Sequence, residues 1–191
     1  MATPRARNDC ETSVRFASVL TDLPVHWPAR EHRGDPEEMA RGPDRGEKAP
    51  SFELESTHGR ISLAAKLASG AVLLVFYPAD DSPVCTRQLC DYRDHLQEFT
   101  GLGVEVLGIN PESLESHRAF AQKHGLPFPL LSDPTREVCR AYDAVGLLGM
   151  TRRSLFLIGR SGRVAYRKTD LPIFHRTAEE LRKVIAGADL S

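Results

Sequence analysis

The chain has 191 residues, 41% of them hydrophobic, and a formal net charge of −1 at pH 7. This length supports one domain with a full hydrophobic core. A net charge so close to zero argues against nucleic acid and anionic membranes as partners, because proteins that bind either of them usually carry an excess of basic residues. No apolar run approaches the roughly 20 residues of a membrane-spanning helix.

The four cysteines are Cys10, Cys85, Cys90 and Cys139. They are too few and too unevenly spaced for a secreted domain held together by disulfides, so we expect a reducing, cytoplasmic location. The cysteine and histidine spacings match no zinc motif. We therefore expect no bound metal.

Residues 1–45 are rich in proline and in charges of both signs, and they show no sustained hydrophobic period. They lack the apolar core of a signal peptide, and they contain the acidic residues that a transit peptide avoids. We predict that residues 1–45 form a disordered tail and that residues 46–191 form the folded domain.

The first elements of the domain are predicted to be strands. Phe52 to Leu54 and Arg60 to Leu63 indicate a small N-terminal β-hairpin that turns at His58-Gly59. Ala71 to Tyr77 is a continuous apolar run with β-branched and aromatic residues, which is typical of a strand buried on both faces.

A helix with two cysteines is predicted to follow this strand and to run to about Thr100. Pro78 ends the strand, the Ser82 hydroxyl is placed to cap the helix, and Pro83 suits the first helical position. Cys85 then lies in the first turn, where the helix N-terminus stabilises the nucleophilic thiolate.

The two cysteines of this helix are predicted to differ in position. One face, which packs on the sheet, is formed by residues at steps of four and three: Cys85, Leu89, Tyr92, Leu96 and Phe99. Cys90 lies roughly 140° around from Cys85, with Cα atoms about 8 to 9 Å apart in a regular helix. A disulfide needs less than about 7 Å, so bonding the two would require part of the helix to unwind.

The second half of the chain continues the alternation of strands and helices. The predicted elements are a strand over Val104–Ile109, a helix from Asn110-Pro111-Glu112 to about His124, an extended piece over 127–131, a helix capped by Asp133-Pro134, strands over Ser154–Ile158 and Arg163–Lys168, and a helix from Thr177. This order predicts an α/β fold in which a mixed central sheet has helices on both faces.

Several motifs in this order resemble a known family. Pro78, Ser82 and Cys85 match the Pro-x-x-x-Thr/Ser-x-x-Cys signature of the peroxiredoxins. Cys90 matches the resolving cysteine of the subgroup called bacterioferritin comigratory protein or peroxiredoxin Q. Phe128-Pro129-Leu130-Leu131-Ser132-Asp133 is a further match, and the resemblance runs from about Gly46 to the last helix. It implies a thioredoxin-like fold.

The resemblance also implies an arginine beside the cysteine, three residues before the Phe of a Phe-Leu-Ile motif. Counting back from Phe156 gives Arg153. Neighbouring strand residues point to opposite faces, so Arg152 and Arg153 cannot both reach Cys85. We expect Arg153, because Gly162 keeps the family's spacing to the next turn, and Arg152 remains the alternative.

The activity that the resemblance implies is a thiol-dependent peroxidase without a cofactor. Cys85 would attack hydrogen peroxide or an organic hydroperoxide and become a sulfenic acid. Ser82 and Arg153 would hold the peroxide oxygens, and Pro78 would shield the thiolate. Cys90 would close a disulfide, and a thioredoxin-like dithiol protein would reduce it. The subgroup also implies a monomer.

Two other functions fit parts of the pattern. A thiol–disulfide oxidoreductase acting on proteins predicts Cys-x-x-Cys, whereas this chain has Cys-x-x-x-x-Cys. A redox sensor would react at Cys85 once, without repeated consumption of peroxide. Cys10 and Cys139 receive no catalytic role in any of these readings.

Overall fold

The computed structural model describes residues 41–171 and 174–191, and for Leu147 the backbone alone. The predicted tail thus falls outside the described residues except for its last five. Within these five, Asp44 accepts a hydrogen bond from Arg167 at 2.7 Å, and the neighbouring Gly46 N–H donates to the Val164 carbonyl at 2.8 Å. The chain therefore joins the folded domain before Gly46.

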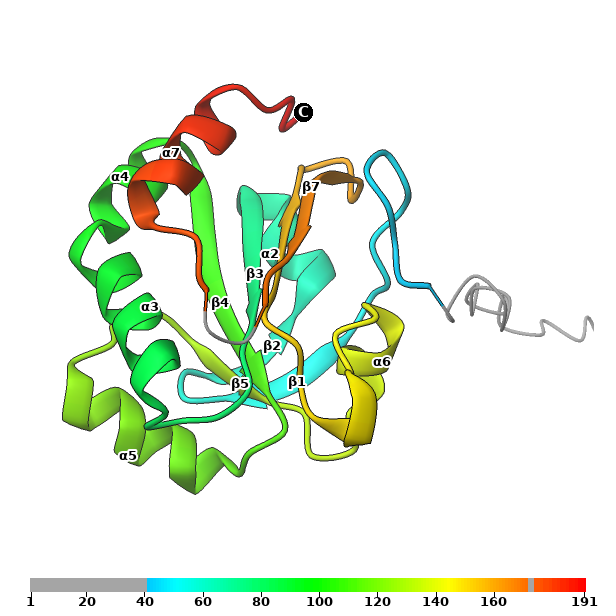
Figure 1. Ribbon diagram of the computed structural model, residues 1–191. Coiled ribbons are helices and arrows are strands. Elements are labelled where there is room, and N and C mark those ends of the chain that lie inside the picture. Colours follow the sequence, from blue (N-terminus) through cyan, green and yellow to red (C-terminus); the bar gives the residue numbers. More distant parts are fainter. Residues whose placement is uncertain (1–40, 172–173) are drawn as a thin grey trace, which may run out of the picture. The chain divides into compact units, whose positions relative to one another are not determined.

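A seven-stranded mixed sheet forms the centre of the domain (Figure 1). Its strands are β1 (Glu53–Ser56), β2 (Gly59–Ser62), β3 (Ala71–Phe76), β4 (Val104–Asn110), β5 (Leu130–Ser132), β6 (Ser154–Ile158) and β7 (Val164–Thr169). The strand order is β2-β1-β5-β4-β3-β6-β7. The pairs β3–β4 and β4–β5 are parallel and the others are antiparallel, as a thioredoxin-like mixed sheet requires.

Helices cover both faces of the sheet. They are α2 (Leu63–Ser69), α3 (Pro83–Asp94), α4 (Leu96–Gly101), α5 (Leu114–His124), α6 (Glu137–Ala141) and α7 (Ala178–Ala186), with a short 3₁₀ turn η1 (Leu147–Gly149). Helices α3, α4, α5 and α7 pack on one face, and α2 and α6 on the other (Figure 1). Strand β3 is buried throughout because Leu73 and Val75 face the first group while Leu74 and Phe76 face the second.

The predicted strands agree closely with the structure. The hairpin of β1 and β2 is antiparallel, with Glu53 opposite Ser62. Strand β1 begins at Glu53, one residue later than predicted. Strand β6 has the predicted bounds, and β7 begins one residue late at Val164. Helix α2, which begins at Leu63 directly after β2, was not predicted.

The predicted helices need three corrections. The cysteine helix breaks at His95, which has φ −110° and ψ 13°, so α3 and α4 are separate helices. Helix α5 begins after Ser113, whose hydroxyl caps it, rather than at Asn110. Helix α6 begins after Arg136, later than a cap position at Asp133 implies, although the Asp133 carboxylate does accept from Cys139 N–H in the first turn.

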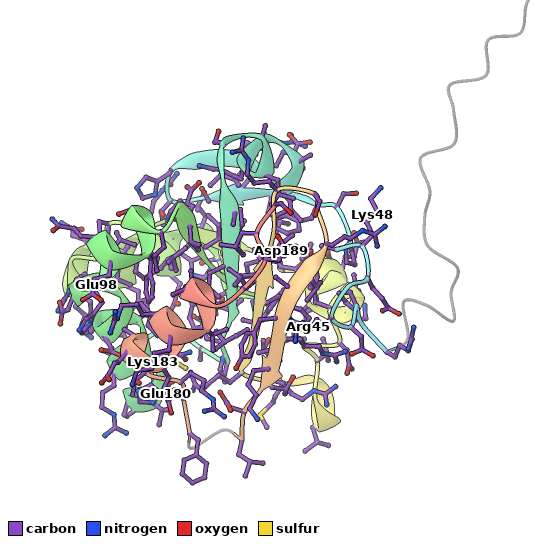
Figure 2. All side chains as sticks on the ribbon, turned by 90° about the horizontal axis from the view of Figure 1, so that it is seen from above. Arg45, Lys48, Glu98, Glu180, Lys183 and Asp189 are labelled. Atoms are coloured by element: carbon purple, nitrogen blue, oxygen red, sulfur yellow. The ribbon has the colours of Figure 1, made fainter. Side chains whose placement is uncertain are left out.

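The last helix matches its prediction. Thr177 accepts from Glu180 N–H, and the Glu180 side chain accepts from Thr177 N–H, which together form a capping box. None of the helices in the described part of the chain combines the length and apolar character that crossing a membrane requires. Figure 2 labels the charged side chains Glu180 and Lys183 on α7, and the neighbouring Arg182 pairs with Glu98 of α4 at 3.1 Å.

Candidate active site

Cys85 lies at the start of α3, where the chain leaves the end of β3. Pro83 is the first helical residue, as predicted, and Cys85 is fully buried in the first turn. Leu89 and Tyr92 lie on the same face and belong to the same core cluster, which confirms the predicted packing face. Ser82 occupies the N-cap position, but its hydroxyl makes no capping bond, so that part of the prediction is wrong.

Arg153 is the cation beside Cys85. It precedes β6 and shares strand parity with Leu155 and Leu157, which pack under α3. Its side chain is 2% exposed, and Nη2 donates to Cys85 Sγ at 3.3 Å. Arg152 has the opposite parity, is exposed, and donates to Asp143. The structure therefore places Arg153, and not Arg152, against the thiol.

Gln88 is a buried partner of Arg153 that is not among the predicted site residues. Its Oε1 accepts from Arg153 Nη1, and its Nε2 donates to the Tyr92 hydroxyl at 2.9 Å. Tyr92 in turn donates to the Arg176 carbonyl at 2.8 Å. The helical spacing of Cys85, Gln88 and Tyr92 could have indicated a polar residue beside the cysteine. This chain of hydrogen bonds fixes the guanidinium against the sulfur.

Cys90 is half-buried and stands outside the core cluster that contains Cys85. Both thiols are free. Directly after Cys90, the Asp91 carboxylate accepts from Ala178 N–H at 2.7 Å, and Arg93 Nη1 donates to the His124 carbonyl. The C-terminal half of α3 is therefore attached to α5 and to the N-terminus of α7.

Cys139 lies on the other face of the sheet, in α6, and is fully buried. Burial raises the pKa of its thiol, and the neighbouring Asp133 carboxylate raises it further. Such a thiol is a poor nucleophile because the thiolate is the reactive form. Cys10 falls outside the described residues.

The two carboxylates that precede Cys85 are both paired. His117 Nδ1 lies 2.8 Å from the buried Asp80 Oδ2, while exposed Asp81 pairs with Lys123 at 2.6 Å. Burial opposes ionisation of Asp80, but hydrogen bonds from His117 and Ser116 outweigh it and lower its pKa to about 2. Arg153 thus contacts the sulfur while both acidic neighbours have partners of their own.

Asp80, Glu112 and His117 also bring three ligand atoms within 4.8 Å of one another. Hydrogen bonds account for this cluster. Asp80 Oδ1 accepts from Tyr77 and Asn110, and Oδ2 lies against Ser116 and His117. The arrangement gives no reason to place a metal ion there.

A cysteine at a helix N-terminus beside a buried arginine, on this mixed sheet, defines a class: the thiol-dependent peroxidases with a thioredoxin-like fold. The chain belongs to the AhpC/TSA family, whose model matches residues 45–167. It is 34% identical to peroxiredoxin Bcp of Bacillus subtilis over 145 residues, which is 72% of this chain and 92% of the relative. It is 39% identical to the chloroplast peroxiredoxin Q of Sedum lineare over 122 residues, 62% of this chain and 64% of that protein.

Solved structures support the same family assignment. The bacterioferritin comigratory protein of Xanthomonas campestris superposes with a TM-score of 0.62 at 30% identity, covering 71% of this chain and 88% of that one. These findings confirm the predicted peroxiredoxin resemblance, its subgroup and the thioredoxin-like fold. The protein is a thiol-dependent peroxidase.

Proposed function

We propose that Cys85 is the thiol that reduces the peroxide. The observation that carries this assignment is the 3.3 Å contact from Arg153 Nη2 to Cys85 Sγ at a buried helix start. A guanidinium at this distance stabilises the thiolate, and the helix N-terminus adds to that effect. The thiolate attacks one peroxide oxygen, the S–O bond forms as the O–O bond breaks, and the departing oxygen leaves as water or an alcohol after taking a proton.

Three other residues are proposed to shape this step. Arg153 Nε is buried and has no hydrogen-bond partner among the described residues, so the guanidinium has a donor left for a substrate oxygen. The Ser82 hydroxyl is not used as a helix cap and is likewise available. Half-buried Pro78 lies in the loop between β3 and α3, where we expect it to shield the sulfur.

Cys90 is proposed to resolve the sulfenic acid. Its thiol attacks the Cys85 sulfur, a disulfide forms, and the sulfenic oxygen leaves as water. Since Cα atoms five residues apart in a helix are about 8 to 9 Å from each other, the turn between the two must unwind. The contacts of Asp91 and Arg93 attach the helix just beyond Cys90, so unwinding can stop there.

The substrate and reductant complete the proposal. The X. campestris protein has alkyl peroxide reduction activity, and we extend this substrate class, together with hydrogen peroxide, to this chain. A fully buried Cys85 admits a small molecule more readily than a protein disulfide, which disfavours a protein oxidoreductase. We propose a thioredoxin-like dithiol protein as reductant, and a monomer acting in the cytoplasm.

The test measures peroxide-dependent oxidation of a thioredoxin and thioredoxin reductase couple by the wild type, Cys85→Ser and Cys90→Ser. Intact mass is recorded after one equivalent of peroxide. We expect no turnover in Cys85→Ser, a disulfide in the wild type, and a sulfenic or over-oxidised Cys85 in Cys90→Ser. Undiminished turnover in Cys90→Ser would overturn its resolving role, and a single oxidation without turnover in the wild type would indicate a sensor.

A further inference from the structure

The loop between β3 and α3 is held by one buried side chain. Asp80 lies between Pro78 and Ser82, and its carboxylate is only 4% exposed. Tyr77 Oη donates to Oδ1 at 2.8 Å, and Asn110 Nδ2 donates to the same oxygen at 3.1 Å. This first oxygen therefore ties the loop to the ends of the two parallel strands β3 and β4.

The second carboxylate oxygen ties the loop to α5. Ser116 Oγ donates to Asp80 Oδ2 at 2.7 Å, and His117 Nδ1 lies 2.8 Å from the same atom. The Asp80 backbone N–H also donates to Glu112 Oε2 at 2.8 Å. Both oxygens and the main chain of this one residue are thus held by groups at least 30 positions away, apart from Tyr77.

Fully buried His117 is held from both sides. Its Nε2 lies 3.2 Å from the Leu131 carbonyl oxygen, which can only accept a hydrogen bond. Its Nδ1 faces the Asp80 carboxylate, which is also an acceptor. His117 therefore bridges the Asp80 carboxylate and strand β5, which adds to the hold on the loop.

We propose that Asp80 is a positioning residue for peroxide reduction. It anchors the loop so that Pro78 and Ser82 stay in place around Cys85, and it does so through its hydrogen bonds rather than its charge. This inference rests on the proposed role of Cys85. Nearby negative charge opposes a thiolate, so an electrostatic role for Asp80 would have the opposite sign.

The substitutions Asp80→Ala and Asp80→Asn separate position from charge. Alanine removes every side-chain bond of the anchor. Asparagine keeps an acceptor oxygen for Tyr77 and Asn110, and its amide N–H can donate to a neutral His117 whose Nδ1 then accepts. Asp81→Asn is the matched control, because it removes the adjacent charge, leaves the anchor intact, and suits the φ of 55° at that residue.

The experiment measures two rates at Cys85 in each full-length variant: oxidation by hydrogen peroxide, and alkylation by iodoacetamide, which reports the thiolate without needing a peroxide pocket. We expect Asp80→Ala to lower the peroxide rate about tenfold to a hundredfold without lowering the alkylation rate. Asp80→Asn and Asp81→Asn are expected to stay within about threefold of the wild type, since both keep the loop in place.

Other outcomes would overturn the inference. Equal losses in Asp80→Ala and Asp80→Asn would refute a role through the hydrogen bonds that asparagine retains, and a faster rate in both variants would assign the effect to charge. An unchanged peroxide rate in Asp80→Ala would remove any positioning role. If Asp80→Ala does not fold, Ser116→Ala takes its place, since it deletes one donor to Oδ2 from a helical position that accepts alanine. We then expect Ser116→Ala to have a severalfold lower peroxide rate, and an unchanged rate would refute the anchoring role of Asp80. A wild type whose Cys85 ignores peroxide would instead refute the proposed function.

Discussion

Arg153 Nη2 donates to Cys85 Sγ at 3.3 Å, although the two residues are 68 positions apart in the chain. The contact depends on two local patterns. The start of α3 places the sulfur over the sheet, and alternation along β6 turns Arg153 toward that same face. The buried guanidinium of Arg153 and the buried thiol of Cys85 thereby meet at the end of β3.

Replacing Arg153 with Met removes the donor while keeping an unbranched side chain of similar length. We expect the second-order rate of peroxide reduction to fall about 100-fold to 1,000-fold, the loss typical for a group that stabilises developing charge. Stopped-flow oxidation of the reduced protein measures this rate. Arg152→Met is the matched control, because that exposed residue bonds to Asp143, and a comparable loss there would contradict the assignment.

Gln88 tests whether the orientation of Arg153 matters as well as its presence. Gln88→Met leaves Arg153 Nη1 without its buried acceptor, so we expect a peroxide rate about tenfold lower and a free energy of unfolding lower by about 1 to 3 kcal/mol. Gln88→Glu keeps an acceptor and should retain most of the rate. Chemical denaturation and peroxide kinetics on both variants check this, and equal losses in the two would contradict it.

Several features of this site could be predicted from the sequence because they are local. The apolar run of β3, Pro83 at the helix start and the parity of Arg153 each depend on a few neighbouring residues. The break at His95 could not be predicted, since apolar periodicity continues across it to Phe99. Ser82 has the composition and position of a cap but makes no capping bond.

Long-range polar contacts were beyond sequence reasoning for a different reason. Asp80 and His117 are 37 positions apart, and only the folded sheet brings β3 beside β4 and α5. Histidine is intermediate between the buried and the exposed residue types, so nothing local indicates that His117 is buried. Helix α2 was missed because its seven residues are too few for a helical period to be distinguished.

The acid stability of the protein should depend on Asp80. Its pKa is about 2 in the folded protein against an ordinary value of 3.8, so the folded state binds the proton less tightly than the unfolded state. The stabilisation, about 2 kcal/mol from this difference, is fully present above about pH 4 and is lost as the pH falls toward 2. Urea unfolding at several pH values measures it. Asp80→Asn does not titrate and should show a shallower dependence, whereas an identical pH profile would contradict the assignment.

Cys139 provides a test of which thiol takes part in the disulfide. It is fully buried on the face of the sheet opposite Cys85, and burial raises the pKa of its thiol. We therefore expect Cys139→Ala to form the same disulfide after one equivalent of peroxide and to turn over at the wild-type rate. In the native reduced protein, iodoacetamide should label half-buried Cys90 well before Cys139, as peptide mass spectrometry can measure. A disulfide that includes Cys139 would require the sheet itself to open, and its detection would replace the unwinding of α3 as the resolving step.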